Sequence, residues 1–464
     1  MTHTNTPSPK SRPNSPISGL PGALGSAVPP PIVPFRFFIA CGLGLIGFGI
    51  ALAFNAGPVI NNPTGHQVLA VVHLALLAFL STLVIGALHQ FGPVLGSKPL
   101  RSIKWATLSF WLFVIGSWGL PLGFATGVSV LVSISGAIVV CGVAIIIWNL
   151  SAPLSSKDKS VSATGLRWSL TFLVITVFFG MLYALDRENN WFLLVPHIVL
   201  AHAHLGLIGW IGLSYVAVSE KLLPMFLLAH RPTPGPGAWA VRLIPLGLFI
   251  LAPGLVLGIS WIVAVGAIVL IGGLTAHLGS LFDYIYKRRR RKFDFYQGFL
   301  LASASFLVLA IIFGLIAALA HASTSLRTHL VEDEIISLTA WLSIASVGHL
   351  HKVIPFINWG LLRSKGLATR QGGKQLLFAD LFESKIAWIS LVGLVLSFVL
   401  LDASVVTTIS QGIVISGVFL SLVSLITMWN LGLGPKRALR DENKGSVLSE
   451  KDLSMMRNIH NKQF

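Results

Sequence analysis

Charged residues are scarce in this chain. They make up 11% of its 464 residues, whereas hydrophobic residues make up 54% and the mean hydropathy is +0.81. Soluble domains carry about 25% charged residues, so the composition excludes a soluble globular domain. Cysteine is also scarce, because Cys41 and Cys141 are the only two. They match no CxxC or CxxCH pattern, which excludes a disulfide framework and covalent haem attachment, and we interpret both as packing residues.

A signal peptide is missing as well, since no apolar h-region precedes the first long apolar stretch. Residues 1–33 are rich in Pro, Ser and Gly and predict a disordered cytoplasmic tail. Residues 431–464 are charged and polar and predict a second cytoplasmic tail. The chain between them, 34–430, is therefore expected to form one membrane domain.

Long apolar stretches, in contrast, are abundant. A membrane-spanning helix needs about 20 mostly apolar residues. The chain supplies twelve such stretches, near 34–56, 66–90, 104–124, 126–149, 167–185, 192–218, 239–257, 259–283, 295–320, 334–358, 385–402 and 405–430. We therefore expect an all-α, polytopic membrane bundle of about twelve transmembrane helices.

The formal charge of +17 is distributed in a way that excludes nucleic acid as the partner and indicates a lipid bilayer. Basic residues gather in every second connection, as in the run KRRRRK at 287–292, while the alternate connections carry acids such as Glu332, Asp333 and Glu334. By the positive-inside rule the basic connections and both termini are cytoplasmic. We expect a multi-pass protein of the bacterial cytoplasmic membrane.

A proline repeat divides the chain into three units. Pro93, Pro224 and Pro355 lie 131 residues apart, and each closes an apolar segment. The three segments are spans two, six and ten, which run in the same direction under the predicted topology. The sequence thus predicts a pseudo-threefold repeat in which helices two, six and ten are equivalent.

Histidines fall at matching offsets from these prolines. His73 and His204 precede their prolines by 20 residues, and His66 and His197 precede theirs by 27. His202 lies two residues before His204, about 200° around the helix, and so addresses a different partner. All five are expected in the outer half of the membrane.

His73 and His204 face each other if spans two and six are neighbours. An imidazole in hydrocarbon pairs with a neighbouring Ser, Thr or carbonyl group, or it binds a partner or cofactor. The matched depths favour bis-imidazole ligation of a low-spin haem between two helices. Gly206, Gly209 and Gly212 leave little side-chain bulk after His204, which suits a macrocycle and equally suits close helix packing.

The run HAHLGLIGWIGLSYVAVSEKLLP at 202–224 resembles the HxH helix of haem-copper oxidase subunit I, especially in the bacterial high-affinity class. The segment HLALLAFLSTLVIGALHQFGPVL, which begins at His73, resembles the second helix of that family. Through the twelve-span arrangement the resemblance covers about 34–430. It implies that His73 and His204 hold a low-spin haem b and that His202 is a candidate ligand of a second, high-spin haem. It also implies respiratory electron transport, a quinol or small cytochrome as electron donor, and additional membrane subunits.

The chain departs from that family at the copper site. The family has HxH on its tenth helix, whereas here it lies on the sixth and the tenth has Ile335 at the matching place. The copper site needs a His-His pair on helix seven, and the chain contains no adjacent pair. We therefore expect a relative that keeps haem but has lost copper and acts in electron transfer or in redox or gas sensing. The alternative, an oxidoreductase of the terminal oxidase or nitric oxide reductase type, would need copper at positions such as His66, His197 and His202.

Two further groups are candidate sites. His329 lies one offset from the layer of His66 and His197, so these three outer histidines are a candidate copper or zinc site. The second group precedes each repeat proline by four residues and is a candidate proton-entry or quinone-head site on the cytoplasmic side; it comprises His89, Glu220 and His351. The alternative for this second group is an interfacial position in which the side-chain tips reach water.

A different class of function also stays open. Repeat-built carriers place their sites at helix interfaces, so the histidines are also compatible with a metal or proton transporter without haem. His277 and His321 stand alone in the sequence. We interpret both as satisfied core or interface residues.

Overall fold

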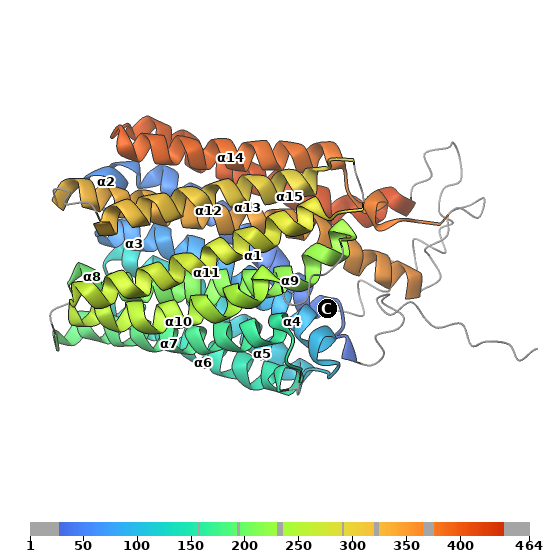
Figure 1. Ribbon diagram of the computed structural model, residues 1–464, viewed down its shortest axis with the longest axis horizontal. Helices are drawn as coiled ribbons and strands as arrows, with labels where there is room; N and C mark the ends of the chain where they lie inside the picture. Colours follow the sequence, from blue (N-terminus) through green and yellow to red (C-terminus); the bar gives the residue numbers. More distant parts are fainter. Residues whose placement is uncertain are drawn as a thin grey trace, which may run out of the picture.

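Helices that run side by side along the long axis of the molecule make up the computed structural model, with no strand among its described residues (Figure 1). The structure describes residues 27–155, 158–192, 195–229, 235–289, 292–319, 324–364 and 375–439. Of the predicted tails at 1–33 and 431–464, residues 1–26 and 440–464 lie outside these ranges, as does His321.

The helical elements follow one another with short connections. In chain order they are α1 (Ile32–Phe54), α2 (Ala56–Asn61), α3 (His66–His73), η2 (Leu74–Ser81), α4 (Thr82–Gly96), α5 (Ile103–Thr126), α6 (Ser129–Leu154), α7 (Val161–Asn189), α8 (Pro196–His204), η3 (Leu205–Gly212), α9 (Leu213–Leu227), α10 (Pro236–Leu257), α11 (Ser260–Tyr286), α12 (Phe295–Leu319), α13 (Thr324–Ser364), η4 (Phe378–Leu381), α14 (Ser384–Val406) and α15 (Ser410–Leu439). The elements η2 and η3 are π-helical, and η4 is a 3₁₀ turn.

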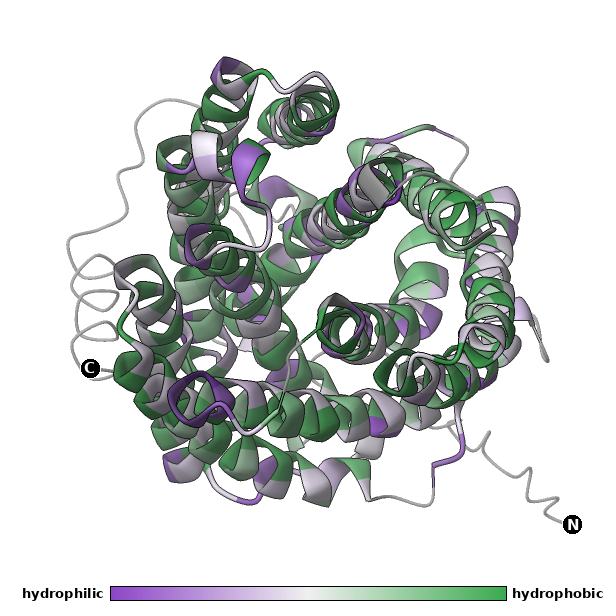
Figure 2. Ribbon diagram, turned by 90° about the vertical axis from the view of Figure 1, so that its left-hand side faces the viewer, coloured by the Kyte–Doolittle hydropathy of each residue, from purple (hydrophilic) through white to green (hydrophobic). Residues whose placement is uncertain are grey.

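Eleven helices of the described chain are long and apolar enough to cross a membrane. The predicted all-α polytopic membrane bundle is therefore confirmed. The longest helix, α13, has 41 residues and is not among the eleven, so the count of twelve spans stays a prediction. In the end-on view of Figure 2, apolar colouring covers most of every helix, as expected where lipid or protein surrounds each turn.

Consecutive long helices pack as antiparallel hairpins. The pairs α5 with α6, α10 with α11, α12 with α13 and α14 with α15 are in extensive contact, and α1 packs against α15. Connections therefore alternate between the two ends of the bundle, and the C-terminal ends of α4 and α9 lie at the same end (Figure 1). Which end faces the cytoplasm stays a prediction.

Spans two, six and ten meet inside the bundle. The segments η2, η3 and α13 contact one another. Trp210 of η3 is buried and its indole N–H donates to the Ser81 hydroxyl of η2 at 2.9 Å. A Cβ on Gly212 would lie 3.4 Å from the buried Trp341 ring of α13. Two tryptophans therefore fix the distances among the three spans.

The two π-helical segments occupy matching positions. η2 begins directly after His73 and η3 directly after His204, and each is eight residues long. A π turn leaves carbonyl groups without their usual partner, and the Thr82 hydroxyl donates to one of them, Leu77 O, at 2.9 Å. The structure thus gives spans two and six the same local feature, while the threefold repeat as a whole stays a prediction.

Several predicted boundaries differ from the structure, and the start of span ten differs most. Span ten was expected from residue 334, but α13 begins at Thr324, so Glu332 and Asp333 are helical residues and not part of an outer connection. Because Glu332 and Asp333 are polar, the hydropathy pattern does not reveal that the helix begins before them. At the C-terminal end, α15 continues to Leu439, beyond the expected boundary at 430.

The close approach of α1 to η2 generates a stability prediction. A Cβ on Gly44 would collide with the backbone of Ala78, whereas a Cβ on Gly57 would meet nothing within 4 Å. We expect Gly44→Ala to lower the free energy of unfolding by about 1–3 kcal/mol, the usual cost of overpacking. Gly57→Ala is the matched control and should be neutral. Thermal unfolding of both variants in detergent tests this, and equal melting temperatures would contradict it.

Candidate functional site

Five histidines of the three inner spans share one hydrogen-bond pattern. In each, the ring Nδ1 lies 2.7 to 2.9 Å from the backbone carbonyl oxygen four residues earlier, and the five are His73, His89, His204, His349 and His351. A carbonyl oxygen only accepts, so Nδ1 must carry the proton. In the neutral imidazole the lone pair then lies on Nε2, which is free to accept a proton or to bind a metal.

His73 and His204 end the α-helical turns that precede the two π segments. η2 and η3 are in contact below them, whereas α3 and α8 are not among the closely packed helix pairs of the described chain. Spans two and six are therefore more closely packed at the π segments than at the level of the two imidazoles. Both side chains are only partly buried, and the His73 ring packs on Phe124 with centroids 5.0 Å apart.

Glu334 of α13 lies beside His204, one of the proposed ligands, a placement that the sequence analysis did not predict. One of its carboxylate oxygens lies 3.8 Å from Nε2 of His204, and both side chains are 17% exposed. Glu334 also packs against Gly314 of α12, where a Cβ would lie 2.7 Å from its carboxylate. The acidic residue was assigned to an outer connection, so only the early start of α13 brings it into the bundle.

The side chain of His202 lies on a different face of α8 from that of His204, as their two-residue offset predicts. Its ring lies edge-on to Tyr183 of α7 at 5.6 Å, and a Cβ on Gly180 would lie 3.1 Å from it. Nδ1 of His202 is buried and has no partner in the described chain. The ring is also close enough to His73 for the two to interact electrostatically. The structure therefore brings His73, His202, His204 and Glu334 to one region.

The three outer histidines proposed to bind copper or zinc are not brought together. The described residues contain no group of three or more His, Cys, Asp or Glu side chains placed to hold a metal ion. His66 is exposed and bonded to Arg187 at 2.9 Å, His329 lies 3.2 Å from Glu332, and His197 is exposed near Gly258. Equal offsets from the repeat prolines predict equal depths in the membrane, but each of the three side chains faces a different neighbour.

The set of residues four positions before the repeat prolines is buried, so the interfacial alternative is wrong. His89 and His351 are 0% exposed and Glu220 is 4% exposed. His89 stacks on Phe37 with centroids 5.2 Å apart, and His351 lies among Phe295, Phe299 and Phe382. Nε2 of both histidines has no partner in the described chain. Each residue has its own neighbours, and no contact among the three is seen.

Glu220 has a well-defined environment. It accepts hydrogen bonds from the Ser280 hydroxyl at 2.6 Å and from the Tyr284 hydroxyl at 3.0 Å, both on α11. A Cβ on Gly237 would collide with its carboxylate, so α10 also closes over it. These bonds compensate part of the desolvation of a buried carboxyl group.

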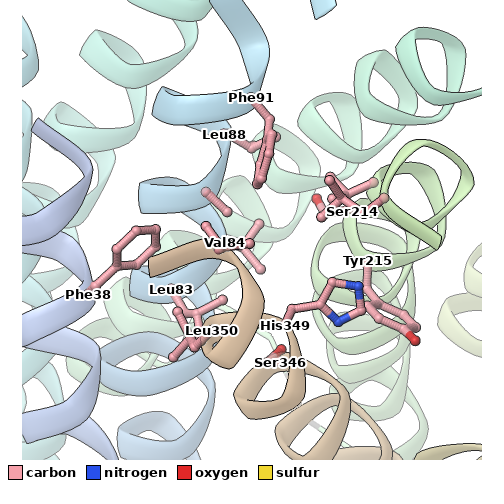
Figure 3. Close-up of a pocket in the computed structure, with 14 residues that line it drawn as sticks. Phe38, Leu83, Val84, Leu88, Phe91, Ser214, Tyr215, Ser346, His349 and Leu350 are labelled. Carbon is pink, nitrogen blue, oxygen red and sulfur yellow. The ribbon is translucent and has the colours of Figure 1, made fainter. Parts of the chain in front are cut away.

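A second buried polar cluster lies between α9, α11, α12 and α13, and sequence analysis missed it. His277 is 1% exposed and neither ring nitrogen has a partner in the described chain, so its interpretation as a satisfied residue is wrong. Its ring lies 5.4 Å from Tyr215, which in turn lies 5.5 Å from His349. Nε2 of His349 accepts from the Tyr296 hydroxyl at 3.2 Å. Figure 3 shows Tyr215 and His349 side by side at a cavity of about 50 Å³.

No family model matches the chain, and no curated protein matches it. The functional argument therefore depends on the geometry of the described residues.

The Glu220 bonds generate a prediction. We expect Tyr284→Phe to lower the free energy of unfolding by about 1–3 kcal/mol, because it removes a hydrogen bond from a buried carboxyl group. Tyr286→Phe is the control, since Tyr286 lies on the same helix and is 86% exposed. Thermal unfolding of the two variants in detergent should differ by several degrees. A loss of stability in the control as large as in Tyr284→Phe would contradict the assignment.

Proposed function

We propose that this membrane protein binds a haem b between His73 and His204 and acts in electron transfer or in redox or gas sensing. One observation carries the proposal: two imidazoles directly precede matching π segments, and each has Nδ1 bonded to a backbone carbonyl. Metal-ligating histidines almost always donate their other ring N–H in this way, which fixes the ring and raises the basicity of the ligating nitrogen.

The donor chemistry of the site fits a low-spin haem. Two neutral imidazoles supply both axial ligands without adding charge, and burial then tunes the reduction potential. At the level of the two imidazoles α3 and α8 are less closely packed than η2 and η3, and a macrocycle would lie between the helices at this level. π-helical turns are frequent at functional sites, and here two of them adjoin the proposed ligands.

Glu334 must move for this site to form. One of its carboxylate oxygens lies 3.8 Å from Nε2 of His204, and the cavity of about 50 Å³ is lined by neither His73 nor His204. Glu334 and His204 are each 17% exposed, so neither side chain is fully enclosed. His202 faces α7 and is the candidate ligand for a second haem. We do not propose a copper site at His66, His197 and His329.

A histidine-lined proton carrier without haem is the second candidate. It is favoured by carboxyl groups inside the bundle: Asp333 of α13 is 5% exposed, and one carboxylate oxygen of Glu334 lies 3.8 Å from Nε2 of His204. Ionisable residues within a membrane domain often mark proton pathways. The haem content of the purified protein separates the two candidates.

The experiment is a reduced-minus-oxidised optical spectrum of the protein purified from cells supplied with haem. We expect a b-type spectrum in the parent chain and its loss in both His73→Ala and His204→Ala, because one imidazole alone cannot give bis-imidazole ligation. His197→Ala is the matched control, since His197 is an exposed residue of the helix that carries His204. It should retain the spectrum.

Two results would contradict the proposal. A parent protein that folds in detergent without any haem spectrum would reject haem and favour the proton carrier. A full spectrum in His73→Ala or in His204→Ala would show that the iron is bound elsewhere.

A further inference from the structure

The connection between α4 and α5 is fixed against the end of α6. The backbone N–H of Ser102 donates to Asn149 Oδ1 at 2.9 Å, and the Asn149 side chain donates in return to Ser102 O at 3.1 Å. A Cβ on Gly96, the last residue of α4, would collide with the backbone of Pro153 of α6. These contacts leave the connection little freedom, so it carries its basic side chains at a defined place on the bundle.

Arg101, in this connection, is held by two residues of α6. Its Nε donates to the Ser151 hydroxyl at 2.9 Å, and its guanidinium carbon lies 5.5 Å from the centroid of the Trp148 ring. The Trp148 ring in turn lies edge-on to Trp105 of α5, with centroids 6.1 Å apart. A guanidinium carries five N–H donors, and Arg101 makes no other hydrogen bond within the described chain. Its two terminal nitrogens therefore keep their donors for a further partner.

Two exposed lysines, Lys98 and Lys104, flank Arg101. We call these three residues the basic patch. Within the described ranges none of the three pairs with a carboxylate, whereas Lys287 of α11 pairs with Asp283 at 2.7 Å. The basic patch also adjoins the N-terminus of α5, where the helix dipole disfavours additional positive charge. An anion bound here would thus relieve an unfavourable concentration of charge.

The two tryptophans mark the depth of the basic patch in the membrane. Trp105 and Trp148 are 47% and 46% exposed, one near the start of the apolar helix α5 and the other near the end of the apolar helix α6. Exposed tryptophans near the ends of transmembrane helices lie at the level of the lipid headgroups. The anion that is abundant at this level is the phosphodiester of a phospholipid, and the planar guanidinium fork matches its oxygens in a bidentate geometry.

An apolar stripe continues from the basic patch towards the middle of the bilayer. Leu108, Trp111 and Ile115 of α5 are 42%, 56% and 55% exposed. Residues at this spacing share one face of a helix, and Lys104 precedes Leu108 by one turn on the same face. A molecule with a phosphodiester and two acyl chains therefore meets cations at its head and apolar side chains along its tails.

We propose that the basic patch binds one anionic phospholipid of the phosphatidylglycerol type. The terminal nitrogens of Arg101 donate to its phosphodiester, Lys98 and Lys104 supply further positive charge, and its acyl chains lie along the stripe on α5. Basic pockets beside transmembrane helices bind anionic headgroups in this way. A zwitterionic phospholipid has the same phosphodiester but brings an ammonium group of its own, so three unpaired cations favour the anionic lipid. This inference is independent of the proposed haem.

The test uses the full chain, purified in detergent and incubated with equal amounts of dioleoyl phosphatidylglycerol and dioleoyl phosphatidylethanolamine. Native mass spectrometry then measures which lipid the protein retains. We expect one phosphatidylglycerol to be retained in preference to phosphatidylethanolamine. Inorganic phosphate should not displace it, because phosphate lacks the acyl chains that contact α5.

Variants of the basic patch assign the binding to its residues. Arg101→Gln should lower the retention of phosphatidylglycerol by about tenfold, as expected when a hydrogen bond between charged groups is lost. Lys104→Gln should lower it by about fivefold, the usual effect of one basic residue near anionic lipid. Arg242→Gln is the matched control, because Arg242 is also exposed and stacks on an exposed tryptophan, Trp239, but both residues belong to α10. It removes one positive charge and should leave retention unchanged.

Four results would overturn the inference: equal retention of the two lipids, unchanged retention in Arg101→Gln, an equal loss in Arg242→Gln, or displacement of the lipid by inorganic phosphate. The first and third would show that the basic residues attract anionic lipid without a defined site. Thermal unfolding in detergent serves as the folding control, and Arg101→Gln should melt with the parent chain because Arg101 is exposed.

Discussion

The need to satisfy every polar group inside the bundle is the constraint on which this structure depends. Lipid offers no hydrogen bonds, so the histidines of the inner spans use the nearest acceptor, the carbonyl four residues earlier. That bond occurs in five of them, including His73 and His204. This hydrogen bond fixes both the orientation of the ring and its tautomer. As a result, the lone pair of each of these rings lies on Nε2, and the possible chemistry of the protein depends on the groups around those atoms.

The groups that surround the Nε2 atoms depend on how the three inner spans pack against one another. Trp210 and Trp341 hold η2, η3 and α13 together at one level. At the level of the imidazoles α3 and α8 are less closely packed than η2 and η3, and a carboxylate oxygen of Glu334 of α13 lies 3.8 Å from Nε2 of His204.

The sequence predicted the parts of the molecule that periodicity and hydropathy control. Twelve apolar stretches correspond to helices, and His202 and His204 diverge as their two-residue offset requires. The sequence did not predict the features that depend on packing between helices. Glu332 and Glu334 were assigned to a connection because acids interrupt the apolar pattern, yet they lie inside α13. Equal offsets placed His66, His197 and His329 at one depth but did not determine their directions. Burial of His89, Glu220 and His351, and the cluster around His277, depend on neighbouring helices that no local pattern specifies.

The central claim is that the Nε2 atoms of residues 73 and 204 are ligands and not partners of side chains. A cryo-electron microscopy map of the purified protein tests this most directly. The account predicts a planar macrocycle between α3 and α8, with both imidazoles coordinating its centre and the Glu334 carboxylate displaced from His204. A map in which α3 and α8 keep their present positions, with His204 paired to Glu334 and no additional density between the helices, would contradict it.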